Sequence, residues 1–174
     1  QSFITEKYIR MSGMKKTFEN INDAKQALEE VKPLTAGKYA GTNYEFKHRA
    51  HTRSINGSVT YIVNDKRERH QDVVLYIHGG AWFQDPLENH FDFIDQLAGE
   101  LDARVIMPVY PKVPHRDYRT TFELLKNIYQ KEILEVENPK HMTIMGDSAG
   151  GQIALSFAQY LKKETSLPVS YTHL

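Results

Sequence analysis

The sequence predicts an α/β fold in which a mostly parallel sheet carries helices on both faces and an antiparallel hairpin at one edge. Two observations carry this prediction. Three short apolar segments alternate with three longer segments of helical periodicity over residues 73–161, as in consecutive βαβ units. Ahead of them, β-rich runs flank Asn56-Gly57, a dipeptide that favours two-residue hairpin turns.

The composition describes an ordinary globular chain. Its 174 residues, 40% of them hydrophobic, suffice for one domain with a buried core. Lys plus Arg and Asp plus Glu both number 22, so no net charge recruits nucleic acid or an anionic membrane. The absence of cysteine excludes disulfides and thiolate chemistry. With no apolar leader in 1–16 and no membrane-length apolar run, we expect a cytoplasmic protein with neither nucleic acid nor membrane as partner. The oligomeric state stays open.

The elements follow in chain order. Residues 1–40 form an N-terminal segment with an amphipathic helix at 20–31, which Asn20 or Asn22 can cap and Pro33 ends. Residues 41–167 form the core, beginning with the hairpin strands 53–55 and 58–63. The buried strands are expected at 73–77, 104–109 and 142–145, and the helices at 88–101, 118–134 and around 153–161.

A serine motif follows the third buried strand. Gly146-Asp147-Ser148-Ala149-Gly150 matches G-x-S-x-G and opens a helix, the context in which this motif carries a nucleophile. A serine at such a sharp turn has a strained backbone, and its small neighbours let strand and helix approach. The N–H groups of the new helix point towards a developing anion. The alternative is a glycine turn with Ser148 as helix cap, but the strand–turn–helix context favours the nucleophile.

A second motif, His78-Gly79-Gly80-Ala81-Trp82, follows the first buried strand. Adjacent glycines let the backbone approach a substrate and direct N–H groups at one point, as an oxyanion hole requires. We expect the oxyanion donors to be the N–H groups of Gly79, Gly80 and Ala149. His78 is expected to support this loop rather than act as a base.

Other side chains near the two motifs have supporting roles. We expect Asp147, Gly146 and Gly150 to support the turn that carries the serine. Trp82 and Phe83 offer apolar surface to a substrate. Asp85 either lines the pocket or belongs to a surface turn.

Together the H-G-G-A-W and G-D-S-A-G-G motifs resemble those of the hormone-sensitive-lipase-like family of α/β-hydrolase fold esterases. The resemblance covers roughly residues 51–167. It implies a carboxylic-ester hydrolase that forms an acyl-enzyme on small or medium acyl esters, with a small-molecule ester as partner and no cofactor. In this family the chain before the first strand often helps to form a cap, so we expect the helix at 20–31 to be a cap element.

The chain departs from the family pattern after the helix that begins next to Ser148, which we call the elbow helix. The family's triad continues from the serine to an acid and then a histidine on later loops. Here no Asp follows Ser148, Glu164 falls on the elbow helix, and the one later histidine is His173. We therefore expect a truncated, N-terminal part of the fold with a non-native tail at 168–174. Lacking the triad acid and base, it should show little or no turnover.

Two other functions remain open, a non-catalytic binding protein or relic on the same fold and another acyl-transfer hydrolase such as a peptidase or sugar deacetylase. No metal site is expected. The H-x-x-H formed by His48 and His51 lies on loop or strand, where positions i and i+3 face opposite sides. The histidines with polar neighbours are expected to be solvated surface residues: His70, His90, His115 and His141.

Overall fold

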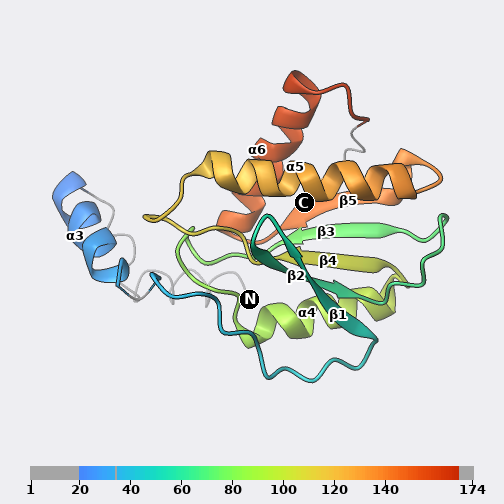
Figure 1. Cartoon of the computed structure of the whole chain (residues 1–174), viewed down its shortest axis with the longest axis horizontal. Helices are drawn as coiled ribbons and strands as arrows, with labels where there is room; N and C mark the ends of the chain where they lie inside the picture. Colours follow the sequence, from blue (N-terminus) through green and yellow to red (C-terminus); the bar gives the residue numbers. More distant parts are fainter. Residues whose placement is uncertain (1–19, 34, 169–174) are drawn as a thin grey trace, which may run out of the picture.

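A computed structural model describes residues 20–33 and 35–168 and has the predicted alternation of strands and helices (Figure 1). The strands are β1 (Ala50–Ile55), β2 (Ser58–Val63), β3 (Val73–Ile77), β4 (Arg104–Pro108) and β5 (Met142–Gly146). The helices are α3 (Ile21–Val31), α4 (Glu88–Glu100), α5 (Tyr118–Glu135) and α6 (Ala149–Glu164), with a 3-10 turn at Pro139–His141. Each helix and strand expected in this part of the chain is present.

The five strands form one mixed sheet in the order β1-β2-β4-β3-β5. β3 runs parallel to both β4 and β5, whereas β2 is antiparallel to β1 and β4. The hairpin therefore extends one edge of the parallel sheet, which confirms the predicted architecture. Its turn is closed by Asn56 and Gly57, both with positive φ (50° and 78°), as a two-residue hairpin turn requires.

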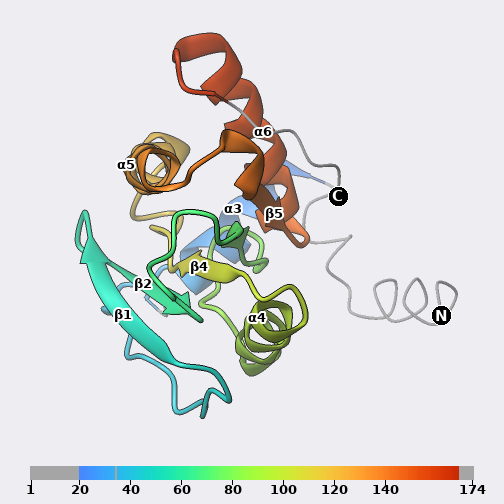
Figure 2. The ribbon, with the colours of Figure 1, turned by 90° about the vertical axis from the view of Figure 1, so that its right-hand side faces the viewer.

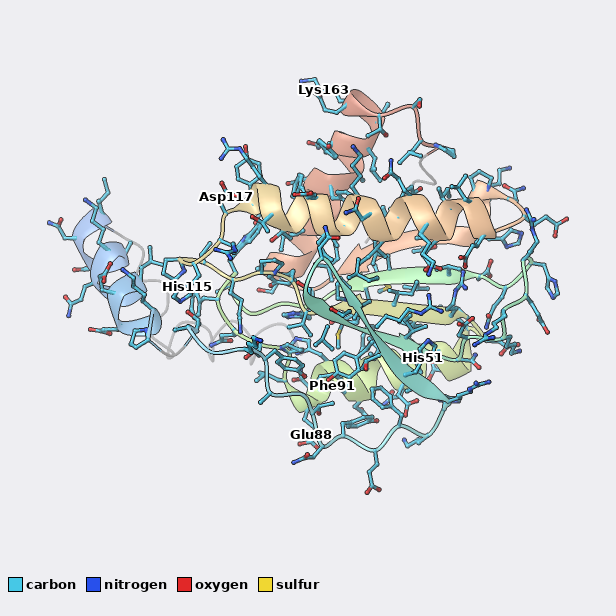
Figure 3. All side chains as sticks on the ribbon, viewed as in Figure 1. His51, Glu88, Phe91, His115, Asp117 and Lys163 are labelled. Atoms are coloured by element: carbon cyan, nitrogen blue, oxygen red, sulfur yellow. The ribbon has the colours of Figure 1, made fainter. Side chains whose placement is uncertain are left out.

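Helices cover both faces of the sheet (Figure 2). The helices α5 and α6 pack on one face, and α4 packs on the other, where Figure 3 shows Phe91 beneath the sheet. All five residues of β3 are buried, which explains why the segment is continuously apolar. In β1, at the sheet edge, exposed and half-buried residues alternate instead over most of the strand.

The N-terminal helix α3 lies apart from the sheet in Figure 1. Its start is capped as predicted, because the Asn20 side chain accepts hydrogen bonds from the N–H groups of Asn22 and Asp23 at 3.0 and 2.9 Å. Just beyond the helix, the carbonyl oxygen of Lys32 accepts a 2.9 Å bond from His115, which lies on the side of the molecule towards α3 (Figure 3). Within the described ranges, no helix is long and apolar enough to cross a membrane.

A buried charge cluster lies at the start of β4. The Arg104 side chain is 8% exposed, and its guanidinium lies 2.8 Å from Glu132, 3.4 Å from Asp65 and 3.5 Å from Glu135. Burial raises the pKa of the Glu132 carboxyl, although Arg104 acts in the opposite direction. Arg104 thus pairs with the buried Glu132 carboxylate, the one of the three that is both shielded from water and, among the described residues, without another ion pair.

Candidate active site

The register of β3 and β5 brings the two sequence motifs side by side. These strands are parallel neighbours, and Ile77 at the end of β3 pairs with Gly146 at the end of β5. The loop that begins at His78 and the turn that carries Ser148 therefore leave the sheet at the same level. Both lie beyond the carboxyl ends of the strands, where ligands bind in open α/β sheets.

Ser148 occupies a strained backbone conformation between β5 and α6. Its φ of 49° and ψ of −121° lie in a region that residues with a side chain rarely adopt. The serine is exposed, and its hydroxyl has no hydrogen-bond partner among the residues that the structure describes. A strained, exposed serine at a strand-to-helix turn is the geometry of a nucleophile elbow.

Close backbone contacts explain the glycines that flank Ser148. A Cβ atom on Gly146 would lie 2.5 Å from the carbonyl oxygen of Ile77 and from the backbone of Gly150. A Cβ on Gly150 would collide with the same Ile77 oxygen and lie 2.6 Å from the carbonyl oxygen of His78. The absence of side chains at these two positions is what lets α6 start directly against the end of β3.

The loop after β3 is a tight turn with unpaired N–H groups. Gly80, Ala81 and Trp82 all have positive φ (121°, 52° and 71°), and the N–H groups of Phe83 and Gln84 donate to the carbonyl oxygen of Gly80 at 3.0 and 2.9 Å. In the described part of the chain, the N–H groups of Gly80 and Ala81 have no recorded acceptor. The Ala149 N–H, in the first turn of α6, is likewise unpaired there.

Gly79 differs from its neighbours. Its N–H, which we expected to be an oxyanion donor, instead donates a 2.7 Å hydrogen bond to the Asp147 carboxylate. A Cβ on Gly79 would also collide with that carboxylate. The structure therefore does not leave Gly79 as a free donor, and Ala81 offers an unpaired N–H that the sequence did not single out.

The Asp147 carboxylate joins the elbow to the loop. Besides the Gly79 N–H, it accepts a 2.6 Å hydrogen bond from the Tyr76 hydroxyl, and Nε2 of His90 lies 3.6 Å from its second oxygen. Partial burial raises the pKa of Asp147, but these three donors together outweigh it and hold the pKa at about 2. The carboxylate is therefore ionised at neutral pH.

His78 lies beneath the loop and is fully buried. Its ring stacks on Tyr110 with 4.4 Å between centroids, and its Nδ1 lies 2.6 Å from the carbonyl oxygen of Gly79. The Tyr110 hydroxyl donates to the carbonyl oxygen of His78 at 3.1 Å. Burial lowers the pKa of His78 to about 4. The imidazole is therefore neutral at neutral pH and buried beneath the loop.

His90 corrects our expectation of a solvated surface residue. It is 6% exposed, because the start of α4 directs its side chain inwards against His78 and Asp147. No local signal in the sequence indicates this, because Leu87, at the position before α4, is not a residue type that marks the start of a helix. The other histidines differ: His70 and His115 are exposed, His141 pairs with Asp72 and His48 with Asp95. No cluster of side chains within 20–33 and 35–168 could hold a metal ion.

The remaining residues predicted to line the pocket lie in the loop after β3. Trp82 is half-buried, and its indole N–H donates a 2.9 Å hydrogen bond to Gln152 of α6. Phe83 is also half-buried, and Asp85 forms an ion pair with Lys112. Gln152 and Lys112 were not singled out from the sequence, because their partners are 70 and 27 residues away along the chain.

A pocket of about 510 Å³ lies beside this site. It is lined by residues 35–39, the hairpin turn and the chain that follows β4. Tyr110 and Lys112 contribute to its wall, but Ser148 does not. The pocket is therefore next to the loop after β3 rather than at the serine itself.

Comparison with known proteins agrees with this geometry. The chain is 32% identical over 95 residues to an esterase of Acinetobacter venetianus, covering 55% of this chain and 31% of that protein. It is 30% identical over 98 residues to the carboxylesterase/phospholipase LipF of Mycobacterium tuberculosis, covering 56% of this chain and 26% of that one.

The crystal structure of a candidate esterase from Staphylococcus aureus superposes with a TM-score of 0.72 at 26% identity, covering 87% of this chain and 51% of that one. The chain thus spans between a quarter and about half of the length of these proteins. The model of the α/β-hydrolase fold family matches residues 74–174, more than half of the chain. On this match and on the geometry of its sheet, the chain belongs to the α/β-hydrolase fold family.

Proposed function

We propose that this chain carries the nucleophile and the oxyanion hole of a carboxylic-ester hydrolase. The observation that carries the proposal is the exposed Ser148, strained at the end of β5 and next to the unpaired N–H groups of the loop after β3. The Ser148 hydroxyl attacks the ester carbonyl, and the N–H groups of Gly80, Ala81 and Ala149 stabilise the oxyanion. One such donor contributes about 3–4 kcal/mol to lowering the barrier.

The reaction also needs a base to accept the serine proton. Between Ala149 and Pro168 the chain has no Asp or His, and among the described residues no imidazole bonds to the Ser148 hydroxyl. We propose that the triad acid and histidine come from outside the described residues. The described residues by themselves then form the acyl-enzyme slowly, because an oxyanion hole without a triad retains only a small part of the catalysis.

The substrate class follows from the relatives and from the site. Two of the proteins described above are named as an esterase and a carboxylesterase/phospholipase, which supports an ester carbonyl as the reacting group. The half-buried Trp82 and Phe83 supply apolar surface for a small or medium acyl chain. We further propose that α3 belongs to a cap, since the Lys32–His115 contact ties its end to the chain after β4.

The test is whether Ser148 becomes acylated. The chain is incubated with p-nitrophenyl butyrate, and intact-mass and peptide spectra locate the butyryl adduct. We expect slow acylation at Ser148, absent in Ser148→Ala and unchanged in Ser156→Ala, which removes a serine further along α6. Ester hydrolysis without a Ser148 adduct, or no serine-dependent acylation at any ester concentration, would refute the proposal and favour a binding protein.

A further inference from the structure

His90 has a defined tautomer. The N–H of Leu87 donates a 2.8 Å hydrogen bond to its Nδ1, and the His90 N–H donates back to the Leu87 carbonyl oxygen at 2.9 Å. A backbone N–H can only donate, so Nδ1 accepts and carries no proton. The ring is therefore neutral, with its hydrogen on Nε2.

The hydrogen on Nε2 is directed at the site. Nε2 lies 3.6 Å from the second oxygen of Asp147, longer than a hydrogen bond, so the contact is an attraction between an N–H dipole and a charge. The His90 side chain is 8% exposed and the Asp147 side chain 47% exposed, so water screens this attraction from the Asp147 side only. The His78 ring lies 5.7 Å away between centroids and is itself neutral.

We infer that His90 is a positioning residue of the proposed esterase site, which keeps the Asp147 carboxylate as the clamp between the elbow and the oxyanion loop. The inference rests on the proposed function, because it assigns a catalytic purpose to that loop. Asp147 precedes Ser148, and Gly79 precedes the donor Gly80, so the 2.7 Å bond between them sets how the nucleophile faces the oxyanion donors.

Counting donors shows why the clamp must be a carboxylate. The Tyr76 hydroxyl and the Gly79 N–H donate hydrogen bonds to Asp147, and the protonated Nε2 of His90 lies 3.6 Å from its second oxygen. An ionised carboxylate accepts the two hydrogen bonds and also attracts the Nε2–H, whereas an asparagine offers one oxygen and one NH₂ group. If its oxygen serves Tyr76 and Gly79, its NH₂ must face the Nε2–H of His90, and two donors then oppose each other. His90 cannot switch tautomer to relieve this, because Leu87 occupies its Nδ1.

A double-mutant cycle tests this account. His90→Asn retains an acceptor for the Leu87 N–H but cannot present an N–H at the position of Nε2. We expect Asp147→Asn to raise the unfolding equilibrium constant about tenfold in the wild-type chain and less than threefold in His90→Asn. His70→Asn removes an exposed histidine and should leave the effect of Asp147→Asn unchanged. Additive effects in the His90 background would overturn the inference.

Two further measurements separate positioning from general stability. A long-range ¹H–¹⁵N spectrum should show the His90 hydrogen on Nε2, and the opposite tautomer would overturn the inference. The Gly79 and Gly80 amide resonances should shift in His90→Asn, while those of Ile153 in α6 stay in place. Unmoved Gly79 and Gly80 amides would again count against it. These readouts need no turnover, so a lack of Ser148 acylation would refute the proposed function without deciding the role of His90 in holding Asp147.

Discussion

The contact between α6 and the end of β3 yields a prediction whose size follows from the structure. In Gly150→Ala the new methyl group collides with the Ile77 carbonyl oxygen and lies 2.6 Å from that of His78. Both are backbone atoms of buried residues, so neither can move aside at small cost. Overpacking of this kind costs about 3 kcal/mol. The better helix propensity of alanine returns up to about 1 kcal/mol, which leaves a net loss of about 2 kcal/mol.

Gly151→Ala is the matched control for this substitution. There the nearest atom to the new methyl is the Gly146 carbonyl oxygen at 3.1 Å, and the other neighbours are further away. We expect its stability to stay within about 1 kcal/mol of wild type, because the tight contact and the gain in helix propensity offset each other. Urea unfolding followed by circular dichroism measures both variants. Equal midpoints for Gly150→Ala and wild type would show that the close approach of α6 and β3 does not require glycine.

Three other predictions concern single side chains. The pKa of His78 is about 4 in the folded chain, against 6.5 for the free side chain. Between these two pH values the unfolded chain therefore binds a proton at His78 that the folded chain does not. Stability should fall by up to about 3 kcal/mol as the pH drops from 6.5 to 4, and His78→Phe should lack this slope in urea titrations at several pH values. Gln152→Leu should cost about 1 kcal/mol and change the emission of Trp82, the only tryptophan; an unchanged spectrum would contradict the bond. Arg104→Leu should lower stability by about 3–5 kcal/mol by leaving the buried Glu132 carboxylate unpaired, and thermal unfolding should show part of that loss recovered by adding Glu132→Gln.

The features that local sequence determines were predictable. The apolar run of β3 and the hairpin turn at Asn56-Gly57 each depend on residues adjacent in the chain, and both lie where they were expected. The same holds for the position of the elbow serine between β5 and α6. Because each motif directly follows its strand, the parallel pairing of β3 with β5 is enough to bring the two motifs together.

The features that depend on long-range side-chain contacts were not predictable. His90 follows the polar residues Glu88 and Asn89 in the sequence, yet the first turn of α4 directs it into the molecule. The partners of Asp147 lie 68 and 71 residues away, and nothing local shows that its carboxylate takes the Gly79 N–H. Because this N–H is already hydrogen-bonded, Gly79 is not free to bind an oxyanion, and this could be seen only in the folded structure.

The pairing of Ile77 with Gly146 has a consequence for how such a site diversifies. The spacing of neighbouring strands, about 4.8 Å, comes from backbone hydrogen bonds and does not depend on side-chain identity. The sheet therefore sets the distance between the start of the loop after β3 and the start of the turn after β5. This distance stays constant while the surrounding side chains change. Side chains on the loop after β3, such as Phe83, can therefore be replaced without changing the position of the strand end that carries Ser148.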